Sequence, residues 1–130
     1  MIATALSFNV ESSLVVVPVT VKVGANILEY KFAVDTGSTV TMIDIDLMSD
    51  IGYEKSDSIQ TVRTVTASKS ETAYEFQIDN IRAIGLTRRN FKVISRSLPV
   101  GLGIDGLLGL NFFKNRELTI DFKLSEIRIK

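Results

Sequence analysis

The tetrapeptide Asp35-Thr36-Gly37-Ser38 brings a carboxylate, two hydroxyls and a glycine together at one point of the chain. It directly follows the strand-like apolar residues 30–34. Glycine permits backbone angles and close approaches that a side chain would forbid, so we predict a sharp turn that fixes the carboxylate in place. A carboxylate held in this way can act as a general acid or base in hydrolysis. The alternative is an Asx-type turn that only closes a hairpin.

The residue inventory limits the chemistry that is available to the chain. The 130 residues include no cysteine and no histidine. Disulfides, thiol nucleophiles, Ser-His-Asp triads and histidine-bound zinc are therefore excluded. Any hydrolysis would have to use carboxylates, hydroxyls, lysines or an all-oxygen metal site. Aspartate chemistry fits this inventory, and we expect no metal and no cofactor.

The charge pattern argues against nucleic acid and membrane partners. Net charge is zero, with 15 basic and 15 acidic residues. The short basic groups Arg88-Arg89 and Lys114/Arg116 are interpreted as solvated loop charges, because phosphate binding usually needs a concentrated basic face. No stretch approaches the roughly 18 to 20 apolar residues of a membrane span. Residues 1–6 lack the pattern of a signal peptide, which favours the cytoplasm, although the compartment otherwise stays open.

A second segment gives the tetrapeptide a context. Residues 104–113 contain an apolar run, the sequence Leu107-Leu108-Gly109, and then a stretch that Asn111 leads. D-T-G-S followed at this spacing by apolar-apolar-Gly resembles the retropepsin-like aspartic proteases, the single-lobed relatives of pepsin. The resemblance runs from about residue 14 to residue 130. It implies an all-β, closed retropepsin-like barrel with one or two short helices, forming a symmetric dimer that cuts peptide or protein substrates.

Aspartic proteolysis needs two carboxylates that face each other across a shared water. Two such groups cannot both ionise easily, so they share one proton. This chain has one D-T-G sequence, so the second carboxylate must come from a second copy. We therefore expect a homodimer whose axis passes between two Asp35 residues. Asp105, in the other Asp-Gly pair, lacks the hydroxyl-glycine continuation and is interpreted as a turn residue.

The resemblance also implies roles for the neighbouring residues. Thr36 matches a threonine that bonds across the dimer axis, and Gly37 matches a glycine that faces the substrate. Ser38 matches a position that can donate a hydrogen bond to the catalytic carboxylate. Leu107 matches an apolar wall of the substrate pocket. Leu108 and Gly109 would pack behind the Asp35 turn, and Asn111 would begin a short helix.

The flap that closes over substrate in this family is expected at residues 61–76. Its tip would contact substrate through Ala67, Ser68, Lys69 and Ser70, and it lacks the glycines of viral members. Viral members also carry an arginine after the second-half glycine, paired with an aspartate beyond the catalytic turn. Leu110 and residues 39–41 occupy those places here, so that polar brace is missing.

The elements that must position these residues are mostly strands. Alternation or apolar runs predict strands at 15–23, 30–34, 61–66, 73–78, 91–94 and a closing hairpin at 118–129, with a short helix at 46–52. Pro18 argues for an edge or a bulge in the first of these strands. Gly24 and the aromatic Tyr30 recur 61 residues later as Gly85 and Phe91, which predicts a strand-turn-strand unit used twice. Arg96 then takes the place of Asp35 in the second unit.

The sequence therefore predicts one domain over residues 1–130, a homodimeric aspartic endopeptidase. We expect dimer contacts at the Asp35 turn and at the chain ends, where two groups of residues alternate in strand fashion: Leu6, Phe8 and Val10, and Ile127 and Ile129. Two alternatives stay open. The first is a catalytically weak or inactive module of the same fold that binds peptide or only dimerises. The second is an unrelated β-barrel with a fortuitous D-T-G-S.

Overall fold

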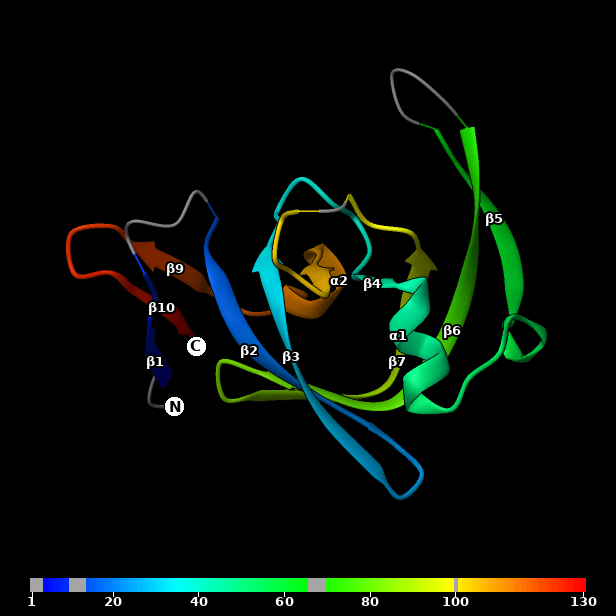
Figure 1. Ribbon diagram of the computed structural model, residues 1–130. Helices are drawn as coiled ribbons and strands as arrows, with labels where there is room; N and C mark the ends of the chain where they lie inside the picture. The colour runs from blue at the N-terminus through cyan, green and yellow to red at the C-terminus, as the bar shows by residue number, and fades with distance from the viewer. Residues whose placement is uncertain (1–3, 10–13, 66–69, 100) are drawn as a thin grey trace.

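The chain forms a closed barrel of strands, drawn in Figure 1. The computed structural model describes residues 4–9, 14–65, 70–99 and 101–130. Within them, one sheet has the strand order β2-β3-β8-β4-β7-β6-β5, and a further pairing between β2 and β6 closes all of these except β5 into a barrel. The bounds are β2 Val16–Val23, β3 Asn26–Val34, β4 Met42–Asp44, β5 Gln60–Val65, β6 Ser70–Ala83, β7 Leu86–Arg96 and β8 Gly106–Leu108. The prediction of an all-β closed barrel is confirmed.

Two hairpins of the same design build most of the barrel. β2 and β3 are joined at Gly24, and β6 and β7 are joined at Gly85. Both glycines have a positive φ, 56° and 75°, which side chains rarely adopt. The two hairpins cross where β2 pairs with β6. The 61-residue repeat of the sequence therefore corresponds to a repeated hairpin, as predicted.

The buried faces of these hairpins form the core. In β2, Val17, Val19 and Val21 have no exposed surface, as their shared parity in the strand predicts. Pro18 lies in the part of β2 that pairs with β3 but not with β6, because the β2–β6 register covers only residues 20–22. Proline cannot donate a ladder hydrogen bond, so this free edge suits it.

Two short strands complete the barrel and carry the chain to the candidate site. β8 runs parallel to β3, and β4 runs parallel to β7, while β4 and β8 are antiparallel to each other. β8 therefore lies directly beside the strand that ends at Val34, one residue before Asp35. The three residues before Asp35 are therefore held by a partner strand more than 70 residues away in the chain.

A second, three-stranded sheet joins the two ends of the described chain. Its order is β1-β10-β9, with bounds β1 Thr4–Ser7, β9 Leu118–Asp121 and β10 Glu126–Ile129. Ile127 and Ile129 are buried against the core, and Leu6 and Phe8 pack beside them. β1 thus pairs with β10 of its own chain, and only the outer edges of β1 and β9 are left for a sheet between copies. Val10, the third residue of the predicted N-terminal pattern, lies outside the described residues.

The helices are short. They are α1 Ile45–Ile51, the 3-10 turn η1 Lys55–Asp57, and α2 Leu110–Phe113. α1 follows β4, and α2 follows β8. α1 ends at Gly52, whose φ of 111° is the left-handed conformation that stops many helices, so the helix predicted at 46–52 is confirmed. In the part of the chain that the structure describes, no helix is both long and apolar enough to span a bilayer.

Candidate active site

The Asp35 turn is fastened to the barrel through its backbone. The Asp35 N–H donates to the carbonyl of Leu108 in β8 at 2.9 Å. The Ser38 N–H then donates to the Asp35 carbonyl at 3.2 Å, which closes a four-residue turn. The position of the carboxylate is therefore set by two strands and one tight turn, as the sequence predicts.

The Asp35 carboxylate stands at the end of β3 with its neighbours open to solvent. Its Oδ1 accepts a hydrogen bond from the Gly37 N–H at 3.0 Å. Asp35 is half-buried, whereas Thr36 and Gly37 are exposed. A Cβ added at Gly37 would lie only 3.2 Å from the same Oδ1, so a side chain here would crowd the carboxylate. One oxygen is thus held by the turn, on a surface that a second molecule can approach.

The hydrogen bond predicted from the Ser38 hydroxyl to the Asp35 carboxylate does not form within this chain. The family resemblance implies that Ser38 can donate its hydroxyl proton to the Asp35 carboxylate. The Ser38 Oγ instead donates to the carbonyl of Val40 at 2.7 Å, and a hydroxyl has one proton to give. The backbone N–H of Gly37 supplies the carboxylate's donor in its place. The Ser38 side chain therefore shapes the loop that follows the Asp35 turn.

That loop packs tightly on Gly109, as the sequence predicts for the segment after β8. The Leu110 N–H donates to the Ser38 carbonyl at 2.8 Å. A Cβ added at Gly109 would lie 2.5 Å from the carbonyl carbon of Val40 and 2.8 Å from the Ser38 oxygen. These contacts are with backbone atoms, which a side chain could not push aside cheaply. Glycine is needed here for close approach.

A cluster of polar side chains joins the segment after Asp35 to the segment after β8. Thr41 has no exposed surface, and both its N–H and its hydroxyl donate to Asn111 Oδ1 at 2.8 Å. The Thr41 hydroxyl in turn accepts from the Gly109 N–H at 3.1 Å. Asn111 Nδ2 donates to the Lys92 carbonyl at 2.9 Å. The cluster links the loop after Asp35, the turn after β8 and strand β7.

The remaining residues of the second segment lie in β8 and α2. Leu108 is fully buried. Leu107 is half-buried in β8. It lies between Ala33 of β3 and Met42 of β4, the two strands that flank β8. Asn111 is the second residue of α2, which begins at Leu110, one residue earlier than predicted.

Asp105 has a structural role, as expected. Its Oδ2 accepts from the Lys31 N–H at 2.9 Å, and its own N–H donates to the Lys31 carbonyl at 2.8 Å. Its carbonyl accepts from the Asp44 N–H at 2.9 Å. These bonds fasten the start of β8 between β3 and β4, away from the end of β3 that carries Asp35.

The predicted flap is a hairpin, and part of its tip can be placed. β5 and β6 pair antiparallel from Gln60 opposite Glu75 to Val65 opposite Ser70. Ser70 is exposed, and its Oγ accepts from Arg63 at 2.8 Å. Three other tip residues of the prediction, Ala67, Ser68 and Lys69, lie outside the described residues.

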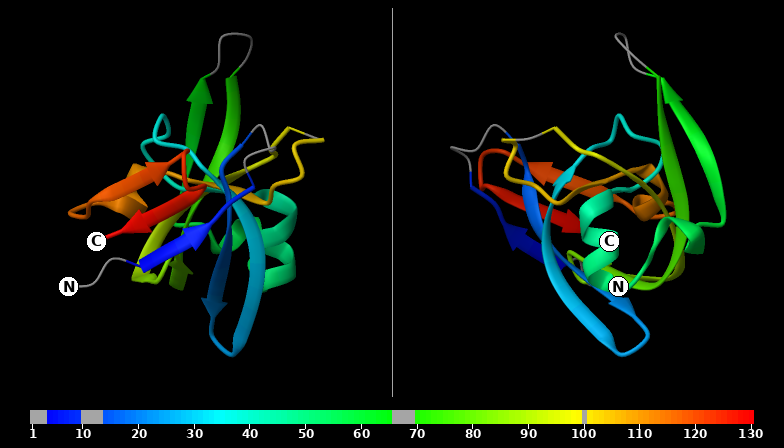
Figure 2. Two further views of the ribbon diagram at one scale, coloured as in Figure 1. Left: turned by 90° about the vertical axis from the view of Figure 1, so that its left-hand side faces the viewer. Right: turned by 45° about the vertical axis from the view of Figure 1, so that its right-hand side comes forward.

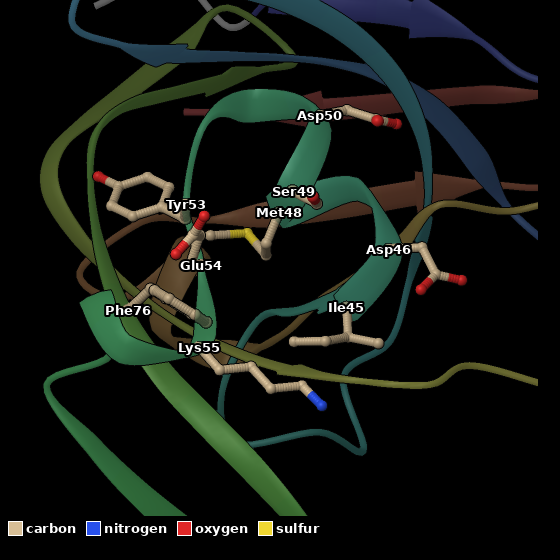
Figure 3. A pocket seen from close by; sticks show the side chains of 9 residues that line it. All are labelled: Ile45, Asp46, Met48, Ser49, Asp50, Tyr53, Glu54, Lys55 and Phe76. Atoms are coloured by element: carbon tan, nitrogen blue, oxygen red, sulfur yellow. The ribbon is translucent and has the colours of Figure 1, made fainter.

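A pocket of about 460 Å³ lies beside α1, away from Asp35. Figure 3 shows the side chains of Met48 and Phe76 between α1 and the segment at Tyr53, with Asp46 and Asp50 directed away from them. A second pocket, of about 500 Å³, lies beside β2 and is lined in part by Pro18. Neither is lined by Asp35, Thr36, Gly37 or Ser38. Among the described residues, no three Asp or Glu side chains gather as a metal site would require.

Sequence reasoning did not identify the hydrogen-bonded pair of Thr41 and Asn111. Thr41 was seen only as part of a missing brace, and Asn111 only as the start of a helix. A buried threonine near a catalytic turn and an asparagine just after a glycine are weak signals by themselves. Their significance depends on the contact between segments 70 residues apart.

Comparisons with known proteins agree with this geometry. A family model described as aspartyl protease matches residues 17–112, well over half of the chain. No curated protein matches the sequence. Among solved structures, the chain is similar to the crystal structure of a retropepsin-like aspartic protease from Rickettsia conorii. The TM-score is 0.72 and the identity 21%, over 98% of this chain and 89% of that one. The chain therefore belongs to the aspartyl protease family and has the retropepsin-like fold.

Proposed function

We propose that the protein is an aspartic endopeptidase that acts as a homodimer, with one Asp35 from each copy. The observation that carries the proposal is the Asp35 turn itself. The Asp35 backbone N–H donates to the Leu108 carbonyl, its carboxylate accepts from the Gly37 N–H, and the neighbouring Thr36 and Gly37 are exposed. This is half of an aspartic protease site, presented on a surface. The family match supports the same chemistry.

In the dimer, the two Asp35 carboxylates would hold one water and one proton between them. The ionised carboxylate takes a proton from the water as its oxygen attacks the carbonyl carbon of the scissile peptide bond. The protonated carboxyl gives its proton to the carbonyl oxygen, which forms a tetrahedral diol. The diol collapses when the carboxyl that took the water proton gives it to the amine nitrogen, one diol hydroxyl returns a proton to the other carboxylate, and the C–N bond breaks. No metal or cofactor takes part in these steps.

The other candidate residues would position substrate and partner. The exposed hydroxyl of Thr36 is available to bond across the dimer axis, and Gly37 leaves room for substrate beside the carboxylate. Leu107 would form an apolar wall of the cleft. Substrate would also be contacted by the tip of the flap, residues Ala67, Ser68, Lys69 and Ser70. Ser38 would act indirectly, through its bond to Val40.

The dimer interface would include the Asp35 turn and the terminal sheet. Because β1 already pairs with β10 within the chain, the strand edges open to a partner are those of β1 and β9. Exposed apolar side chains at the turn after β9, Phe122 at 69% and Leu124 at 60%, adjoin the β9 edge. Burial of such side chains between two copies would add apolar contact to edge pairing.

The test is peptide hydrolysis by wild type and by Asp35→Asn, with both proteins at concentrations that favour dimers. The substitution is nearly isosteric but removes the titrating acid. We expect Asp35→Asn to lose cleavage while its circular dichroism spectrum stays unchanged. We also expect wild type to bind a statine-type inhibitor, because the hydroxyl of the inhibitor mimics the tetrahedral intermediate. Cleavage retained in pure Asp35→Asn would overturn the proposal. Inhibitor binding without any hydrolysis by wild type would favour the alternative of a peptide-binding module.

A further inference from the structure

The β5–β6 hairpin extends past the end of the barrel. The β6–β7 ladder ends at Tyr74 opposite Ser95, whereas the β5–β6 ladder continues to Ser70. Figure 2 shows this hairpin projecting beyond the rest of the molecule in both views. Residues 62–65 and 70–73 therefore pair with each other but with no other strand in the registers of the described sheet. Their orientation relative to the barrel has to be set by other contacts.

One ion pair reaches across this gap from the last residue of β7. Arg96 Nη1 lies 3.5 Å from Glu71 Oε2, and the two side chains are 20% and 24% exposed. Extending the ladder by one step would place Arg96 opposite Ala73, which makes Glu71 its diagonal neighbour on the same face. Arg96 is also in register with Asp44 of β4, so its own backbone is held within the barrel. The pair thus joins the free part of the hairpin to a fixed strand.

The Arg96 guanidinium depends strongly on this partner. Its Nε is buried and has no hydrogen-bond partner among the residues that the structure describes. A partly buried guanidinium with an unfilled donor gains more from a nearby carboxylate than a solvated one would. Glu71 is therefore well placed to fix the orientation of the Arg96 side chain, and Arg96 in turn fixes the position of Glu71.

A second pair on the same face provides a contrast. Lys92 Nζ lies 3.7 Å from Glu75 Oε1, with the same diagonal relation between β7 and β6. The Lys92 side chain is 57% exposed, and Glu75 also accepts from Gln60 at 3.3 Å. This pair lies within the β6–β7 ladder, where the backbone already fixes the strands. The Glu75 side chain is only 8% exposed, but it keeps its bond from Gln60 without the solvated Lys92 ammonium, so we expect Lys92 to contribute little to the orientation of the hairpin.

We propose that Arg96 is a positioning residue that sets the orientation of the β5–β6 hairpin through Glu71. Arg96 occupies, in the second hairpin of the repeat, the place that Asp35 occupies in the first. One copy of the repeated unit thus carries the carboxylate, and the other carries the cation that holds the hairpin expected to cover it. The consequence for peptide cleavage rests on the proposed function, but the consequence for hairpin motion does not.

The first test is amide hydrogen exchange of residues 60–65 and 70–75 in wild type, Arg96→Gln and Glu71→Gln. We expect each single variant to raise exchange rates in the hairpin by about two- to fivefold, and to leave β3 and β9 unchanged. The charge swap Glu71→Arg/Arg96→Glu should restore slow exchange. Lys92→Gln is the matched control and should leave the hairpin rates as in wild type.

Unchanged hairpin exchange in both single variants would overturn the proposal. Equal acceleration throughout the barrel would also overturn it, because Arg96 would then be a general stability residue. If Arg96→Gln does not fold, Glu71→Gln and the charge swap decide the same question. Peptide cleavage gives a second readout: in the single variants KM should rise several-fold with a smaller change in kcat. A protein that cleaves nothing but still shows the hairpin effect would refute the proposed function and leave this inference standing.

Discussion

The Thr41 hydroxyl donates to Asn111 Oδ1 at 2.8 Å and accepts from the Gly109 N–H at 3.1 Å. A fully buried hydroxyl thus has both a donor and an acceptor partner, as buried polar groups require. The pair connects the loop that follows Asp35 to the helix that follows β8. It does so without a charged side chain.

Replacing Asn111 should destabilise the protein. Asn111→Ala would leave the Thr41 N–H, the Thr41 hydroxyl and the Lys92 carbonyl without this partner, at a cost of about 1–3 kcal/mol for each group left unsatisfied. Urea unfolding followed by circular dichroism gives the free energy of unfolding. Asn111→Asp keeps an acceptor for Thr41 but loses the bond to the Lys92 carbonyl. The free energy of unfolding should therefore fall less in Asn111→Asp than in Asn111→Ala. Equal stability of Asn111→Ala and wild type would contradict a stabilising role of the Thr41–Asn111 pair.

Gly109→Ala tests the close packing behind the catalytic turn. The new methyl group would overlap the Val40 backbone, and we expect a loss of at least about 1–3 kcal/mol in unfolding free energy. Gly24→Ala is the control, because it meets open space and is strained only by its φ of 56°. Its loss should be about 1 kcal/mol. A smaller effect at Gly109 than at Gly24 would show that the loop can move aside.

Ser38→Ala should affect stability rather than the pH dependence of catalysis. The variant removes the 2.7 Å bond to the Val40 carbonyl, worth about 0.5–1.5 kcal/mol. Since the hydroxyl does not donate to Asp35, the acidic limb of the kcat/KM profile should stay in place. Profiles of wild type and variant on one peptide make the comparison. An upward shift of that limb would mean that Ser38 turns toward the carboxylate in the dimer.

Alkaline pH should destabilise the fold through its tyrosines. Burial, together with Asp79 and Asp57, raises the pKa of Tyr53, and burial, together with Asp50 and Asp105, raises the pKa of Tyr30. The folded state therefore keeps these protons longer than the unfolded chain does. Their contribution is fully present below the ordinary tyrosine pKa of 10.0 and falls as pH rises through the raised values.

Urea midpoints at about pH 8 and about pH 10.5 measure this effect. Tyr53→Phe should be less stable at the lower pH, because it loses the 2.9 Å bond to the Gln77 carbonyl. It should also lose less stability between the two pH values than wild type does. An equal or larger loss in Tyr53→Phe would show that Tyr53 does not contribute to the alkaline slope.

Much of the fold could be predicted because its signals are local. The valines of β2 alternate as a strand requires, and the glycines at positions 24 and 85 mark two turns that the structure places at a positive φ. The turn at Asp35 follows from the order of its four residues. These features depend on residues that are close together in the chain, so they can be predicted directly from the sequence.

The rest could not be predicted because it depends on which distant segments meet. Alternation in the terminal strands predicts a sheet but not its partner, and β1 pairs with β10 of the same chain. The donor choice of Ser38 depends on where the Val40 carbonyl points. No local sequence pattern predicts that Arg96 pairs with Glu71. The pair forms because β6 extends beyond the end of its ladder with β7, which brings Glu71 near the last residue of β7.

The central claim is that two Asp35 carboxylates make one site, and mixing wild type with Asp35→Asn tests it most directly. Total protein is held constant, at a concentration where the dimer dominates and subunits exchange, while the wild-type fraction is varied. If each site needs an Asp35 from both copies, activity should fall as the square of that fraction, to about a quarter in an equal mixture. Activity that falls in proportion to the fraction, to about half in the equal mixture, would mean that one chain is sufficient and would contradict the shared site.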